Sequence, residues 1–297
     1  MGNNKNTLQS NHSPVSYLQF AINFILFGNT YVALGAACLV QSTCIQLQTA
    51  SYLPEYSVLV FFATLFIYNL QRFFYTPQQD RSLNSIRRKW IFENIKIIKW
   101  LTIIGFIGVL ASFFYNNFRI VFYLSPLLLL SVAYFIPAIK LRKSPFFKLF
   151  TLVIVWTMVT AVLPLLLSDL DPFSKKNLLL ILLRFCFMMA ICIPFDIRDM
   201  QVDAADNVAT LPQLIGEKNT KRLAVTFMLL YIILIIPEYT LGIINTKIAL
   251  ALLLSAVVNL IIVAMSSSKR GEYFYIAAID GTMILQGLML IIAEIFL

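Results

Sequence analysis

The stretch that decides the fold is NLLLILLRFCFMMAICIPF, residues 177–195, which runs directly into DIRDMQVDAADN, residues 196–207. The first part is apolar over a length that suits a helix crossing the hydrocarbon core of a bilayer. The second part carries four aspartates at positions i, i+3, i+7 and i+10. On a helix these fall within an arc of about 80°. We therefore expect a membrane helix that ends in an acidic face.

Eight further apolar stretches accompany this one, separated by turn and charge residues. No stretch alternates polar and apolar residues as a membrane barrel strand does. The sequence predicts an all-α polytopic membrane protein of nine transmembrane helices, with a polar tail over 1–16 and a single domain over 17–297. The expected spans are roughly 18–43, 55–75, 96–115, 118–137, 148–168, 177–195, 221–241, 247–266 and 274–295.

The composition agrees with this class and excludes others. Of 297 residues, 60% are hydrophobic and only 12% are charged, whereas about a quarter of a soluble protein is charged. A soluble enzyme, a disordered chain and a disulfide scaffold are excluded. The only histidine is His12, in the polar tail, which excludes triads and metal sites built on histidine. The four cysteines form no C-x-x-C pair, so buried inert thiols are expected.

The basic residues predict the topology. If the N-terminus lies on one side and the loops alternate, 18 of the 23 Lys and Arg residues fall on that side and five on the other. The positive-inside rule makes the richer side cytoplasmic. We expect the N-terminus and the acidic face inside, the C-terminus on the opposite side, and the chain in the cell inner membrane. The net charge of +9 thus reflects orientation and indicates no nucleic-acid partner.

The acidic face is the strongest functional signal, because like charges on one helix face repel each other. Carboxylates at this spacing are typical of a divalent cation site, and Mg²⁺ is bound by one or two carboxylates together with phosphate oxygens. Cations follow the fourth span and begin the seventh on the same side. They are interpreted either as anchors or as part of a diphosphate pocket, and the acids either as a solvated face or as metal ligands. Glu55, Glu238 and Glu294 are expected to be ordinary interfacial residues.

These residues resemble the UbiA-type intramembrane prenyltransferases. Asp196, Asp199 and Asp203, followed by 210–212 (TLP) and Gly216, are similar to that family's second aspartate-rich motif. The segment 134–142, YFIPAIKLR, is similar to the stretch that follows the family's fourth span, and Asp280 falls where the family often has an acid. The resemblance covers about residues 17–295 and implies a helical bundle around a lipid-open central cavity.

By this resemblance the chain transfers a prenyl group from a prenyl diphosphate to a hydrophobic acceptor, such as an aromatic compound, a quinone precursor or a lipid. It implies Mg²⁺ bound by Asp196, Asp199 and Asp203, with Asp199 or Asp203 as the candidate that takes the acceptor's proton. The expected substrate-binding residues are Asn69, Arg72, Tyr134, Lys140, Arg142, Arg198 and Lys218. The acceptor, the chain length and the oligomeric state are not specified by the sequence.

This chain departs from the first aspartate-rich motif of that family. Asn69 is in place, but Phe73 and Pro77 stand at the two aspartate positions. Arg72 shares a helix face with Asn69, so it is expected either to bind phosphate in place of one Mg²⁺ or to extend to the membrane interface.

Two other functions compete with transfer. A non-catalytic relative would bind a prenyl lipid or a partner, which the departure in the first motif favours. A transporter would place acids near the span centres and break paired helices, a pattern that this chain does not show.

Overall fold

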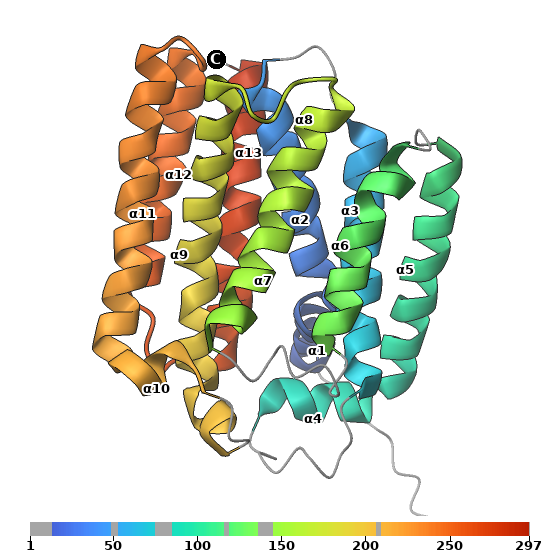
Figure 1. The fold of residues 1–297 in the computed structure, drawn as a ribbon. Coiled ribbons are helices and arrows are strands. Elements are labelled where there is room, and N and C mark those ends of the chain that lie inside the picture. The colour runs from blue at the N-terminus through green and yellow to red at the C-terminus, as the bar shows by residue number, and fades with distance from the viewer. Residues whose placement is uncertain are drawn as a thin grey trace, which may run out of the picture.

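The structure, a computed structural model, describes residues 14–48, 53–74, 85–115, 119–135, 145–205 and 209–296. Within these ranges it is a bundle of long helices without strands, so the all-α prediction is confirmed (Figure 1). The long helices are α2 (Thr30–Gln46), α3 (Pro54–Leu70), α5 (Ile95–Tyr115), α6 (Arg119–Phe135), α7 (Pro145–Thr157), α9 (Lys175–Ala205), α11 (Glu217–Thr240), α12 (Thr246–Ala264) and α13 (Gly281–Phe296).

Shorter elements complete the described part of the chain. These are α1 (Pro14–Phe27), α4 (Ile86–Glu93), α8 (Leu163–Leu167), α10 (Leu211–Ile215), the 3₁₀ turn η1 (Gln71–Phe74) and the π-helical turns η4 (Met158–Val162) and η5 (Phe274–Ile279). We call the end of the bundle with α4 and α10 the basal end, and the end with α8 the apical end (Figure 1).

Each predicted span corresponds to a helix or to a run of consecutive helices. By length and hydropathy, seven helices of the described chain are suited to cross a membrane, or eight if the bent pair α1–α2 is one span. The remaining stretch, 118–137, is α6, whose 17 residues rise about 25 Å, somewhat less than a hydrocarbon core. An integral membrane bundle is therefore supported, and the count of nine stays a prediction.

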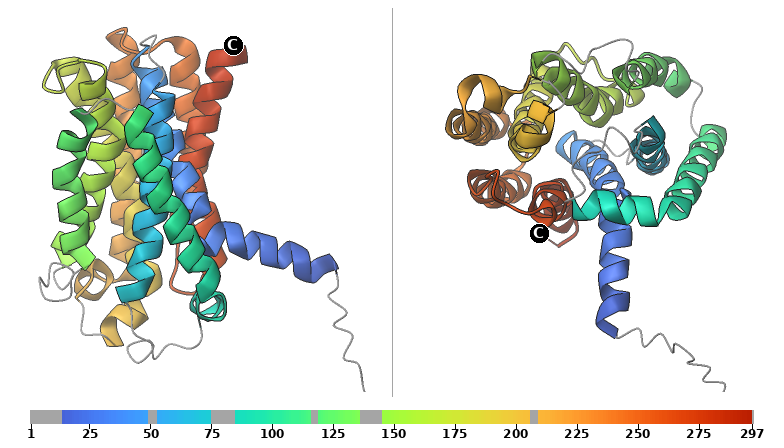
Figure 2. Two further views of the ribbon diagram at one scale, coloured as in Figure 1. Left: turned by 90° about the vertical axis from the view of Figure 1, so that its right-hand side faces the viewer. Right: turned by 90° about the horizontal axis from the view of Figure 1, so that it is seen from below.

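The first predicted span, 18–43, is not one straight helix. The chain bends by 52° between α1 and α2, and α1 leaves the bundle sideways (Figure 2). Asn29 has φ 64°, a left-handed conformation that asparagine tolerates better than most residues. The side-chain amide of Asn69 donates to the Gly28 carbonyl at 3.0 Å, and its oxygen accepts from the Asn29 side chain at 2.9 Å. The bend is therefore satisfied by a residue of α3.

Among the seven helices suited to cross a membrane, α9 has the largest buried share, and it packs against α7, α11 and α12. It continues through Pro194 and does not end at residue 195, so Asp196, Asp199 and Asp203 belong to the same helix as the apolar span. This confirms the expectation of a membrane helix that carries its acids at one end.

A buried arginine ties the apical half of α9 to its neighbours. Arg184 is 1% exposed. Its guanidinium donates to the Leu39 carbonyl at 3.1 Å and to the hydroxyls of Ser42 and Thr43 at 3.3 and 3.1 Å, all on α2. It also reaches Gln286 of α13 at 3.5 Å. These bonds join α2, α9 and α13 inside the apolar core.

One sequence expectation is wrong at this place, and one buried residue was not anticipated. Glu238 was expected to be an interfacial residue, and Arg184 was only counted among the five cations of the side opposite the N-terminus. Both are buried, with Glu238 at 0% exposure on α11, and the two are electrostatically coupled. Arg184 faces α2 and α13, where side-chain and carbonyl oxygens substitute for water. That polar lining is invisible in the local sequence, because its members come from separate helices.

The substitution Arg184→Met tests this tie. It leaves buried hydroxyl and carbonyl acceptors without a donor, so we expect the free energy of unfolding to fall by about 3 kcal/mol. Arg119→Gln is the matched control, because Arg119 forms an exposed pair with Asp169 and should cost below about 1 kcal/mol. Thermal unfolding of the detergent-solubilised variants measures both. Equal melting temperatures would show that the tie is dispensable.

Candidate functional site

A lysine from α7 bridges two of the α9 aspartates at the basal end. The Lys148 ammonium lies 3.0 Å from Oδ1 of Asp196 and 2.7 Å from Oδ2 of Asp203. The three side chains are 13%, 5% and 7% exposed, so this is a nearly buried charge cluster. Asp196 and Asp203 are seven residues apart, two helical turns, which places both on the face that α7 covers. The predicted shared face is thus correct for these two residues.

The third aspartate is engaged differently. Asp199 accepts two bonds from Arg198, from Nε to Oδ1 and from Nη2 to Oδ2, each at 2.8 Å. The guanidinium also lies over the rings of Phe195 and Tyr275, at 4.8 and 5.9 Å from their centroids. Helical spacing alone predicts that Arg198 points away from the face that carries the aspartates. This is wrong, because its long side chain turns back onto its neighbour. Asp199 therefore does not contact Lys148 but forms a fork-to-fork pair.

A second basic segment reaches this end from α4. The carboxylate of Glu272 accepts from the Ser85 hydroxyl at 2.5 Å and from the Arg87 backbone amide at 2.8 Å. The Ser85 hydroxyl in turn accepts from the Arg88 amide at 3.1 Å, capping the helix. These bonds fix the start of α4 against the segment before η5. Arg87 interacts electrostatically with Arg198 and Asp199 of α9, so α4 contributes a charge to the same cluster.

The segment after the aspartates forms the short helix α10. At its start the Gln213 side-chain oxygen accepts from the Thr210 backbone amide at 3.3 Å, and Gly216 ends the helix with φ 81°. Gln213 also donates to the Met200 carbonyl at 3.4 Å. The short helix is therefore attached to α9 just beyond the charge cluster.

The structure brings together only some of the predicted site residues. Asp196, Asp199, Asp203 and Arg198 lie in the cluster, and Arg72 is electrostatically coupled to Arg87 beside it. Asn69 is fully buried and holds the α1–α2 bend, so its position indicates a structural role. The remaining predicted residues are not placed in the cluster. Lys140 and Arg142 lie outside the described residues, as does the side chain of Tyr134, and Lys218 is exposed at the start of α11.

Lys148 and Arg87 are the residues that sequence reasoning missed. Each was counted only as a cation of the predicted cytoplasmic side. The signal available for Lys148 was its position at the first turn of a span on the side of the acids. Arg87 gave no such signal, since it belongs to a short amphipathic segment between spans.

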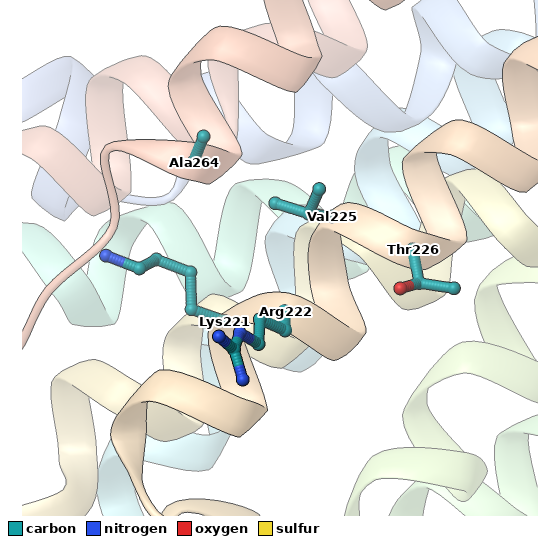
Figure 3. Close-up of a pocket in the computed structure, with 5 residues that line it drawn as sticks. All are labelled: Lys221, Arg222, Val225, Thr226 and Ala264. Atoms are coloured by element: carbon teal, nitrogen blue, oxygen red, sulfur yellow. The ribbon is translucent and has the colours of Figure 1, made fainter.

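A separate groove lies between α11 and α12, away from the aspartates. It has a volume of about 370 Å³ and is lined by Lys221, Arg222, Val225, Thr226 and Ala264 (Figure 3). None of the α9 acids borders it. Two of the cations that the sequence suggested for a diphosphate pocket, Lys221 and Arg222, therefore face a different surface.

The carboxylates in this arrangement do not fit the expected Mg²⁺. Arg198 takes both oxygens of Asp199, and Lys148 takes one oxygen each from Asp196 and Asp203. The second oxygen of Asp196 is buried without a hydrogen-bond partner, and a single such oxygen is short of a coordination set. In the described ranges no group of three or more acidic, histidine or cysteine side chains converges for a metal. In this part of the chain the carboxylates belong to an internal ion-pair network.

Two of the solved structures that resemble this chain share its fold. One is the apo structure of a UbiA homolog from Aeropyrum pernix K1, with a TM-score of 0.64 and 16% identity, covering 90% of this chain and 98% of that one. The other is of digeranylgeranylglyceryl phosphate synthase, with a TM-score of 0.53 and 15% identity, covering 94% and 100%. No family model and no curated protein matches the chain. The likeness confirms the resemblance at the level of the fold.

The Lys148 bridge has a testable energetic consequence. In Lys148→Met two nearly buried carboxylates lose their cation, which we expect to lower the free energy of unfolding by about 3–5 kcal/mol. Adding Asp196→Asn and Asp203→Asn to this variant removes the uncompensated charges and should restore most of that loss. Thermal unfolding is compared with Lys89→Gln, which removes an exposed cation from α4. No recovery in the triple variant would contradict the ion-pair assignment.

Proposed function

We propose that this protein is a membrane-embedded prenyltransferase, which transfers a prenyl group from a prenyl diphosphate to a hydrophobic acceptor. The observation that carries the proposal is the nearly buried charge network of Lys148, Asp196 and Asp203 at one end of an apolar bundle with the UbiA fold. Charged side chains within a membrane bundle are costly, so they mark sites of function. The similar solved structures support the fold, and they do not identify the substrates of this protein.

The proposed chemistry depends on cations and on the exclusion of water. As the allylic C–O bond of the diphosphate breaks, negative charge grows on the leaving phosphate oxygens. Two contacts of the Lys148 ammonium go to Asp196 and Asp203, which hold it in place and leave its third N–H for a phosphate oxygen. The apolar bundle shields the prenyl cation from water until a new bond to the acceptor forms, and the proton that the acceptor loses passes to the released diphosphate.

The aspartates are assigned a positioning role. Asp199 and Asp203 were expected to take the acceptor's proton, but each is held in an ion pair at 2.7–2.8 Å. A carboxylate so paired is already engaged by a cation, and its proposed role is to position that cation. UbiA-type prenyltransferases generally use Mg²⁺. Since the paired carboxylates do not fit that ion, no step of the proposal passes through it.

The positive-inside rule supports placing the basal end in the cytoplasm. In this orientation the N-terminus is inside and the C-terminus lies on the opposite side. The proposed membrane is the cell inner membrane. Prenyl diphosphate then reaches the charge network from the cytoplasmic leaflet, together with a lipophilic acceptor.

A second candidate function is binding of a prenyl lipid without transfer. It is favoured by the same pairing, because every one of the three carboxylates already has a cation. It is also favoured by Phe73, 40% exposed at a position where a metal-binding acid was expected.

The two functions are separated by an assay of the purified protein in lipid nanodiscs. Geranyl, farnesyl and geranylgeranyl diphosphates are supplied with an extract of lipophilic acceptors, and products are identified by mass spectrometry. We expect a prenylated product, and a rate lower by about 10²–10³ in Lys148→Met, since a stabiliser of developing charge is lost. Lys247→Gln, exposed at the apical end, should keep the wild-type rate.

The outcomes lead to different conclusions. A product formed equally by Lys148→Met would remove the charge network from the mechanism. Binding of the diphosphates with no product would favour the non-catalytic candidate. Neither binding nor product would refute both.

A further inference from the structure

The segment that the resemblance assigns to a first metal site has Phe73 and Pro77 at the two acid positions, and its charged residue is Arg72. After Leu70 the chain continues as η1, which contains Arg72 and Phe73 and has no carboxylate. Asn69, the one residue of that motif in place, is turned to the α1–α2 bend. The described part of this segment thus offers a guanidinium to a ligand, where a metal would need oxygen atoms.

A second guanidinium comes to the same region from α4. Arg87 is partly buried, and its Nε atom is buried without a hydrogen-bond partner in the described structure. Glu272 does not satisfy this group, because its oxygens accept from the Ser85 hydroxyl and the Arg87 backbone amide. A buried donor without an acceptor is destabilising, so an anion at this place would relieve it.

The third guanidinium is that of Arg198, which is oriented before any ligand arrives. Asp199 holds its Nε and Nη2, and the rings of Phe195 and Tyr275 support its plane. This leaves Nη1 outside the pair with Asp199. A guanidinium fixed in this way loses little freedom on binding a planar or tetrahedral anion.

The charges of Arg72 and Arg198 both act against that of Arg87. Burial, followed by the charges of Arg198 and Arg72, lowers the pKa of Arg87 to about 9, and Asp199 and Glu272 offset this only in part. Asp280 also faces the group and is coupled to Arg198 and Arg87. A lowered pKa means that the charged form of Arg87 is disfavoured here, although the guanidinium stays protonated at neutral pH. A bound anion would supply the charge that the protein's own acids do not.

We propose that Arg72, Arg87 and Arg198 form a phosphate-binding subsite that works without a divalent cation, in the place of the first metal site. The ligand is a phosphate or diphosphate group. Its identification as the head of a prenyl diphosphate rests on the proposed function above. The subsite lies beside the Lys148 network, so the two would contact one diphosphate from different helices.

The test measures binding to the purified protein in nanodiscs, with EDTA present and with Mg²⁺ added. The probes are inorganic diphosphate and farnesyl diphosphate. We expect wild-type protein to bind farnesyl diphosphate in EDTA, and Arg87→Gln to bind it about ten-fold or more weakly, since a charge-assisted contact is lost. Arg87→Lys keeps the charge without the fork and should be intermediate. Lys89→Gln, an exposed change on the same helix, should bind as wild type does.

Each outcome supports or overturns the arginine subsite. Binding that needs Mg²⁺ and is equal in Arg87→Gln overturns the subsite and leaves the proposed function standing. Binding of inorganic diphosphate in EDTA without binding of farnesyl diphosphate supports the subsite and contradicts the proposed function. Absence of binding under all conditions rejects both. If Arg87→Gln does not fold, Arg72→Gln and Arg87→Lys are measured instead, and equality with wild type in both overturns the subsite.

Discussion

The bridge from Lys148 to Asp196 and Asp203 is the interaction on which the basal end depends. Each charge alone would be expensive inside an apolar bundle, and together they are acceptable only at hydrogen-bonding distance. The bridge therefore fixes α7 against α9. It also explains why acids can continue a membrane helix without a turn between them, since the cation that accompanies them comes from another helix.

Much of the fold follows from the sequence, because apolar length is a local property. The span 177–195 predicted α9, and the residues 210–212 and Gly216, noted for their similarity to a motif, form the start and the end of α10. The bend at Asn29 was not predicted, since its cause is Asn69, forty residues later. Glu238 and Arg184 were misplaced for a related reason. A charge near the end of an apolar run has the same local pattern whether it faces lipid headgroups or a polar interior.

The sequence predicted several of the residues that form the candidate site, but not which side chains pair with each other. Helical spacing correctly placed Asp196 and Asp203 on one face, and it could not show that a lysine of α7 fills that face. Spacing also suggested that Arg198 lies apart from the acids, whereas a flexible side chain of that length reaches its neighbour. The result is a UbiA fold in which internal cations occupy the carboxylates. Likeness of backbone at 16% identity does not carry over the chemistry of individual side chains.

The buried Arg184 holds α9 against α2 and α13 in the apical half of the bundle. Arg184 and Asp196 lie on the same helix, twelve residues or about 18 Å apart, so α9 is held at two levels by unrelated contacts. Rocking α9 against α2 would break three arginine bonds that have no water to replace them. Alternating exposure of a site to the two faces of a membrane is therefore mechanically disfavoured in this bundle. For the proposed activity, donor, acceptor and product would then all pass through a single leaflet.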